Sequence, residues 1–123
     1  MANNLNWFEI PVTDFERAKK FYDILLDANI RKMEWGATTM GFFPAENQID
    51  LGGAIVSGEG YVPSDKGVLI YLNGGDDLSI MLSRVEKAGG KILVSKTLIN
   101  EDYGFFAVFL DSEGNKLALH SPK

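Results

Sequence analysis

The sequence predicts a single α+β domain made of two copies of a βαβββ module, and three observations predict it. A helical pattern that begins at Asp14 returns at Asp77, 63 positions later, which is about half of the 123-residue chain. One extended segment precedes each helix and three follow it. Residues 57–67, rich in turn-forming side chains, separate the two halves. We therefore expect module one at residues 5–56, a linker at 57–67 and module two at 68–121.

The two helices are predicted from apolar residues at helical spacing. These residues are Phe15, Ala18, Tyr22 and Leu25 in the first half, and Leu78, Met81, Val85 and Ala88 in the second. Asp14 and Asp77 are each expected to cap a helix, because a carboxylate accepts hydrogen bonds from the free N–H groups of the first turn. Residues 28–29 and 89–90 tolerate the left-handed backbone that ends a helix, so we place the helix ends there.

The strands are predicted from short extended runs between turn signals. They cover residues 5–12, 30–35, 38–43 and 51–56 in module one, and 68–73, 91–94, 105–110 and 116–120 in module two. A curved four-stranded sheet with a helix on its back leaves its inner face uncovered, and two such sheets can close as a half-open mixed-sheet barrel around a ligand cleft. Residues 95–103 are expected to be irregular and long enough to form a lid that carries Lys96 and Thr97.

Composition narrows the classes of function. The chain is 46% hydrophobic and 24% charged, as in an ordinary globular protein, and it has no cysteine, which excludes disulfides, thiolate metal sites and a cysteine nucleophile. A net charge of −5 repels nucleic acid and anionic membranes. The first residues lack the basic and apolar regions of a signal peptide, and no apolar run has membrane-spanning length. We therefore expect a cytoplasmic protein that binds neither nucleic acid nor membrane.

Two segments carry a resemblance to a known family. Residues 8–14, Phe-Glu-Ile-Pro-Val-Thr-Asp, followed by Ala-Lys-Lys-Phe-Tyr at 18–22, resemble the opening of the vicinal oxygen chelate proteins, the glyoxalase, bleomycin-resistance and dioxygenase superfamily. Residues 104–115 resemble the closing hairpin of these proteins. Together with the repeat, the resemblance covers essentially the whole chain. It implies the duplicated fold of that superfamily.

The resemblance also bears on metal binding. In metal-dependent members, each half supplies one ligand from its first strand, usually His, and one from its last strand, usually Glu. The resemblance places these positions at Trp7, at Leu69 or Ile70, at Ala118 and within residues 51–54. None of the side chains there coordinates a metal. We therefore expect no metal and no other cofactor.

Trp7, Glu9, Tyr71 and His120 are the candidate ligand-binding residues. Glu9 lies two residues after Trp7, so strand alternation places both on the face that the family turns toward the cleft. A carboxylate on that face is either a general base or cation partner, or one half of a structural salt bridge. Tyr71 occupies the position related to Glu9 if the strands are offset by 62 residues. It would then face Glu9 across the cleft, although a tyrosine there also suits packing alone.

His120 is the single histidine of the chain and lies two residues beyond Ala118, on the same inward face. It is either a titratable group at the rim of the cleft or an ordinary polar residue at a strand end. Glu9 and His120 are the candidate catalytic residues. Trp7 and three further apolar positions are expected to form the floor of the cleft: Met40, Phe42 and Phe109.

The sequence thus favours a small-molecule-binding protein without a metal. It resembles the bleomycin-resistance branch, in which an acidic, metal-free dimer sequesters a cationic aromatic compound. The alternative is an enzyme, a glyoxalase-like lyase, an isomerase or a ring-cleaving dioxygenase, that holds a divalent ion with Glu9, His120 and substrate atoms. A structural or regulatory partner-binding domain is a third class. We expect a homodimer, because family members commonly complete their clefts with two chains.

Overall fold

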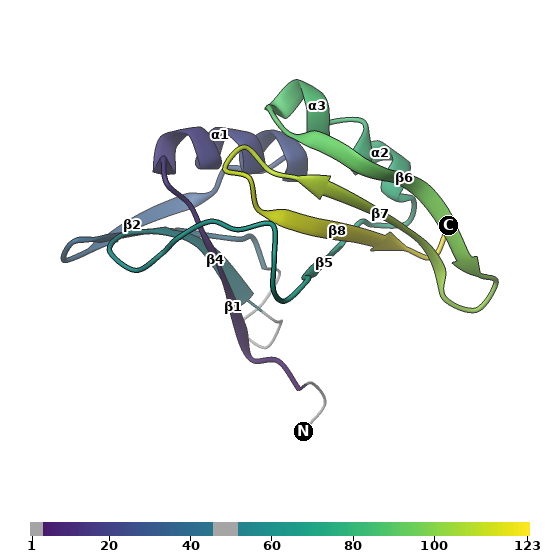
Figure 1. Ribbon diagram of the computed structural model, residues 1–123, viewed down its shortest axis with the longest axis horizontal. Helices are drawn as coiled ribbons and strands as arrows, with labels where there is room; N and C mark the ends of the chain where they lie inside the picture. The colour runs from purple at the N-terminus through teal and green to yellow at the C-terminus, as the bar shows by residue number, and fades with distance from the viewer. Residues whose placement is uncertain (1–3, 46–51) are drawn as a thin grey trace.

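A computed structural model describes residues 4–45 and 52–123 and arranges them as two four-stranded sheets with the helices on one side of both (Figure 1). The elements in chain order are β1 (Trp7–Pro11), α1 (Phe15–Leu26), β2 (Arg31–Trp35), β3 (Thr38–Phe42), β4 (Gly52–Ser57), β5 (Tyr71–Asn73), α2 (Leu78–Leu82), α3 (Val85–Ala88), β6 (Lys91–Asn100), β7 (Gly104–Leu110) and β8 (Lys116–Ser121). The duplicated α+β fold predicted from the sequence is confirmed.

The two sheets repeat one topology. The first has the order β1-β4-β3-β2 and the second β5-β8-β7-β6. In each, the first strand of the module pairs in parallel with the last, and the other pairs are antiparallel. Within the described ranges no strand of one sheet pairs with a strand of the other. The sheets are therefore mixed, as expected, and stay unclosed within one chain.

The helix caps follow the predicted chemistry at both starts. The Asp14 carboxylate accepts a hydrogen bond from Arg17 N at 3.1 Å, and the Asp77 carboxylate accepts one from Ser79 N at 2.9 Å. The helix predicted to begin at Asp77 is divided into α2 and α3, and α3 ends at Gly89 with φ 109°, where the end of that helix was predicted. α1 ends at Asp27 with φ 51°, slightly before the expected residues 28–29. None of the helices in the described ranges has the length and apolar character needed to cross a lipid bilayer.

Two strand boundaries differ from the prediction by three residues or more. β5 begins at Tyr71 instead of residue 68, and the first residue of the expected strand 51–56 lies outside the described residues. β6 continues to Asn100, so the irregular lid expected at 95–103 is wrong. Pairing with β7 holds this segment extended across three register shifts. Such bulges accommodate a polar run that the sequence alone marks as a loop.

The two modules share one hydrophobic core on the helix side of the sheets. Phe21 of α1 stacks on Phe109 of β7, with ring centres 6.1 Å apart, and both side chains are fully buried. Phe109 therefore faces the helices, and its expected place on the cleft floor is wrong. The opposite faces, which we call the helix-free faces, leave large apolar side chains in water. Trp35 is 73% exposed and Tyr71 52%.

The β7–β8 turn of module two fastens onto the start of α1 in module one. The Glu113 carboxylate accepts hydrogen bonds from the backbone N–H groups of Thr13 at 3.0 Å and Asp14 at 2.8 Å. It also accepts one from Arg17 Nε at 2.7 Å. A residue of one module thus satisfies the free donors of a helix in the other.

Candidate functional site

The direction of each side chain on the first sheet follows from its core residues. Ile10 and Ile55 are paired in register and buried against the helices. Glu9 and Ala54, the preceding pair, therefore point to the helix-free face. Trp7 lies on this face too, two residues before Glu9, as strand alternation predicted.

The Glu9 carboxylate is held by two neutral donors. Its Oε2 accepts a hydrogen bond from Trp7 Nε1 at 3.3 Å, and its Oε1 accepts one from the Tyr61 hydroxyl at 3.0 Å. This hydrogen bond and the negative charge of Glu9 raise the pKa of Tyr61 above its ordinary value, so the phenol stays protonated. Neither donor carries a positive charge. Glu9 is therefore oriented by hydrogen bonds, without a salt bridge to any residue that the structure describes.

Aromatic and aliphatic side chains surround this carboxylate. The Trp7 ring lies over Gly52, where an added Cβ would come within 2.7 Å of the indole, so glycine makes room for the ring. Trp7 also meets Phe42 edge to face, with ring centres 6.1 Å apart. Phe42 and Tyr61 pack against a small apolar cluster of Met40, Ala54 and Val56. Met40 and Phe42 thus lie together on the helix-free face.

The other two candidate residues lie on the helix-free face of the second sheet. Tyr71 pairs with Ala118. His120, two residues further along β8, pairs with Asn73. The His120 ring Nε2 hydrogen-bonds to the backbone carbonyl of Tyr103. Among the described residues, no hydrogen bond joins this group to Trp7 or Glu9. The predicted set of four therefore forms two groups, one on each sheet.

Register also resolves which positions of the two modules correspond. The buried pair Leu72–Leu119 in the second sheet has the same place as Ile10–Ile55 in the first. Glu9 then corresponds to Tyr71, as the offset of 62 required, and Ala54 corresponds to Ala118. The position related to Trp7 is Leu69, since Ile70 packs against the shared core.

The family's metal-ligand positions correspond to four residues of this chain. The four positions are Trp7, Ala54, Leu69 and Ala118. Three carry hydrocarbon side chains, and the indole N–H of Trp7 donates hydrogen bonds and has no lone pair for a metal. Nowhere in residues 4–45 and 52–123 do three or more Asp, Glu or His side chains gather in a manner that could hold an ion. These residues do not fit the family's divalent metal.

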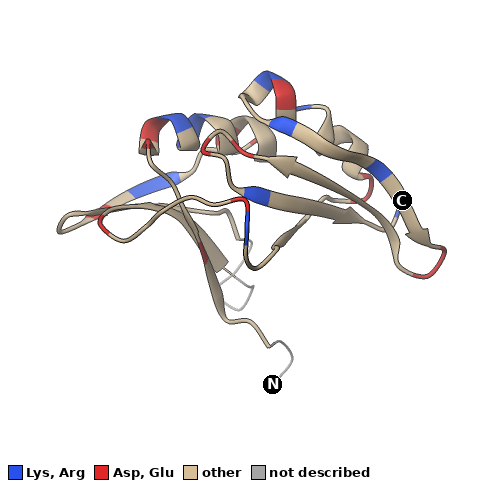
Figure 2. Ribbon diagram, viewed as in Figure 1, with Lys and Arg blue, Asp and Glu red and all other residues tan. Residues whose placement is uncertain are grey.

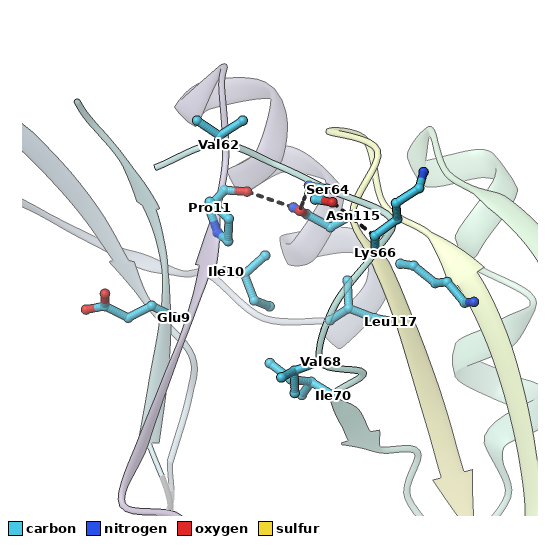
Figure 3. Close-up of a pocket in the computed structure, with 11 residues that line it drawn as sticks. Glu9, Ile10, Pro11, Val62, Ser64, Lys66, Val68, Ile70, Asn115 and Leu117 are labelled. Carbon is cyan, nitrogen blue, oxygen red and sulfur yellow. Dashed lines mark hydrogen bonds between the residues drawn. The ribbon is translucent and has the colours of Figure 1, made fainter. Parts of the chain in front are cut away.

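A cavity of about 290 Å³ lies on the other side of β1, at the junction of the modules (Figure 3). Its walls are mainly apolar side chains from β1, from the segment that precedes β5 and from β8, among them Ile10, Val68 and Leu117. Figure 3 shows the Glu9 carboxylate directed away from these side chains. Glu9 thus belongs to the helix-free face, with only part of its side chain lining the cavity.

The chain matches a known protein superfamily over most of its length. The model of the Glyoxalase/Bleomycin resistance protein/Dioxygenase superfamily matches residues 4–119. The chain belongs to this superfamily. A glyoxylase-like domain-containing protein of Didymella fabae is 33% identical to it over 122 residues, covering 97% of this chain and 94% of the relative.

Solved structures of the superfamily resemble the chain in fold. A V278E mutant of maize glyoxalase I has a TM-score of 0.72 at 21% identity, covering 96% of this chain and 46% of the maize chain. A glyoxalase/bleomycin resistance protein of Albidiferax ferrireducens gives 0.69 at 17% identity, covering 95% and 97%. The fosfomycin resistance protein FosX of Mesorhizobium loti gives 0.63 at 21% identity, covering 100% and 94%. This chain therefore spans slightly under half of the maize chain and nearly all of the two bacterial chains.

Two residues of the helix-free face, Tyr61 and Arg31, were not predicted from the sequence. Tyr61 lies in the linker, whose path over β1 follows from no local pattern. The signal that the sequence offered for Tyr61 was an aromatic residue among turn-forming residues. Arg31 follows from alternation, because Met33 and Trp35 share its face of β2.

Proposed function

We propose that this superfamily member is a cytoplasmic protein that binds a small planar organic molecule with a cationic group, without a divalent metal. One observation carries the proposal: the Glu9 carboxylate is held by the neutral donors Trp7 and Tyr61 beside aromatic rings, without a salt bridge to any described residue. An ammonium group gains both a charge-assisted hydrogen bond and aromatic contact at such a place. The strands around it are mostly uncharged (Figure 2).

The exposed helix-free faces support a homodimer. Trp7, Trp35 and Tyr71 are 42%, 73% and 52% exposed, so both sheets present aromatic surface to water. A second copy whose second sheet covered the first sheet of this chain would bury these side chains. It would also bring its own Tyr71 and His120 toward Glu9 and complete the predicted set of four. Sedimentation at micromolar concentration that gives only a 13.6 kDa species would refute the dimer.

The binding test compares a cation with its neutral counterpart. Benzylamine and benzyl alcohol are titrated into the protein and into Glu9→Gln, and binding is followed by NMR chemical shifts. The expected result is that Glu9→Gln weakens benzylamine by about tenfold or more, the usual effect of losing a charged hydrogen bond, and leaves benzyl alcohol unchanged. Glu34→Gln is the matched control, because Glu34 lies on the opposite face of β2.

The melting temperature of Glu9→Gln distinguishes a binding role of Glu9 from a structural role. Were Glu9→Gln to leave benzylamine binding unchanged while markedly lowering the melting temperature, Glu9 would be a structural partner of Trp7 and Tyr61. The proposed site would then be abandoned.

A further inference from the structure

A single row of residues crosses the first sheet and carries opposite charges at its two ends. Glu9 of β1 pairs with Ala54 of β4, Ala54 with Phe42 of β3, and Phe42 with Arg31 of β2. Directly paired residues point to the same side of a sheet, so all four lie on the helix-free face. An acid and a guanidinium therefore border a platform made of a methyl group and an aromatic ring.

Arg31 and the neighbouring Lys32 point to opposite faces of β2 and make different contacts. Lys32 points to the helix side, where its Nζ bonds to Glu16 at 3.0 Å. Arg31 forms no ion pair with any residue in the described ranges. Its guanidinium carbon instead lies 5.6 Å from the centre of the Phe42 ring. The charge of Arg31 is thus directed inward over the platform, without a salt bridge to any carboxylate of residues 4–45 and 52–123.

The size of the platform limits what could join the two charges. Neighbouring strands are about 4.8 Å apart, so the backbones of β1 and β2 are separated by about 14 Å. Arg31 extends inward by about one strand, because it lies over Phe42. The remaining gap between guanidinium and carboxylate suits a molecule with one ring between its charged groups. Both residues are exposed and able to meet such a molecule.

We propose that the ligand of the Glu9 site is a zwitterion: a planar organic molecule with a cationic group at one end, bound by Glu9, and a carboxylate or similar anion at the other, bound by Arg31. This inference rests on the proposed function and names its ligand class. A purely cationic ligand would lie near an uncompensated guanidinium. A zwitterion satisfies both charges, and its ring lies on the platform between them.

The test uses three probes that share one ring. 4-(Aminomethyl)benzoate carries both charges on opposite sides of the ring, benzylamine only the cation and benzoate only the anion. Each is titrated by NMR into the protein, Arg31→Gln and Glu9→Gln, with Lys32→Gln as the control of equal charge change on the opposite face. The expected result is that 4-(aminomethyl)benzoate binds most tightly. Arg31→Gln should weaken it and benzoate by about tenfold and should not weaken benzylamine.

Two results would overturn the inference in distinguishable ways. If Arg31→Gln leaves 4-(aminomethyl)benzoate unaffected while Glu9→Gln weakens benzylamine, the cation site stands and the zwitterion is rejected. If Glu9→Gln leaves benzylamine unaffected, the proposed function fails and the inference fails with it. Failure of 4-(aminomethyl)benzoate to bind the unaltered protein at millimolar concentration also rejects the zwitterion.

Discussion

The phenolic hydroxyl of Tyr22 donates a hydrogen bond of 2.6 Å to Asp111 Oδ2, and both residues are buried. Tyr22 belongs to α1 of module one, and Asp111 follows β7 of module two. Asp111 Oδ1 also accepts hydrogen bonds from the backbone N–H groups of Glu113 and Asn115. Burial, together with the charge of Asp111, raises the pKa of Tyr22 well above its ordinary value. The hydroxyl therefore keeps its proton and links the turn of one module to the helix of the other.

Replacing Tyr22 with Phe should lower the free energy of unfolding by about 1–3 kcal/mol, because a buried carboxylate oxygen loses a donor. Urea denaturation measures the change. Tyr103→Phe is the matched control, since Tyr103 is 67% exposed and only its backbone groups form hydrogen bonds with the described residues. Equal midpoints for the two variants would show that the hydroxyl of Tyr22 contributes nothing to the joining of the modules.

Glu113→Gln should remove a pH-dependent part of stability. Burial raises the pKa of the Glu113 carboxyl, but hydrogen bonds from Arg17, Asp14 and Ser112 outweigh burial and hold the pKa below its ordinary 4.5. A lowered folded-state pKa stabilises the fold above pH 4.5, and the contribution is lost as pH falls through the folded value.

The unaltered protein should therefore exceed Glu113→Gln in stability by roughly 1 kcal/mol at pH 7, and the difference should shrink steadily below about pH 4.5. Urea midpoints between pH 3 and pH 7 measure it. Glu86→Gln, an exposed change on α3, serves as the control. A difference that stays constant across this range would contradict the role of the charge.

Asp77 offers a direct titration test. The ammonium of Lys96 lies 2.9 Å from Asp77 Oδ1, and this hydrogen bond, with those from Ser79, lowers the pKa of Asp77 to about 2. In Lys96→Met the pKa should rise toward the ordinary 3.8, as measured by NMR titration of the carboxyl carbon. Lys91→Met, at the start of the same strand, should leave the pKa where it is. An unchanged pKa in Lys96→Met would mean that Ser79 alone sets it.

Metal retention tests the mismatch at Trp7, Ala54, Leu69 and Ala118. Protein loaded with zinc, nickel, manganese or iron and then dialysed should retain less than one equivalent of each, because these four side chains supply no ligand. Elemental analysis together with native mass spectrometry measures both metal and any co-purified compound. A stoichiometric ion that survives dialysis would contradict the expectation and favour the enzyme alternative.

The duplicated fold was predictable because each helix carries its own local signals, namely a capping Asp and apolar residues at helical spacing. Which side chains of β7 point toward the helices was not predictable. Residues 104–110 are apolar on both faces, so periodicity does not decide whether Phe109 meets the helices or the open side. The length of β6 was missed for a related reason. Its polar residues 95–97 are held extended by pairing with β7, a tertiary effect.

The site was predictable where it depended on a single strand. Trp7 and Glu9 share a face because alternation has a period of two, and the structure brings them into hydrogen-bonding contact. Tyr61 reaches Glu9 from a linker whose course depends on packing. The choice between Leu69 and Ile70 required the register of β5, since the glycines at 74–75 shift the count along the chain.

The shared core has a consequence for each module on its own. Phe21 and Phe109 stack across the boundary between the modules, so each module supplies only part of one apolar core. A free-standing polypeptide of one module would expose its part to water. Either module by itself would therefore need the other module, or a second copy of itself, to cover that apolar surface.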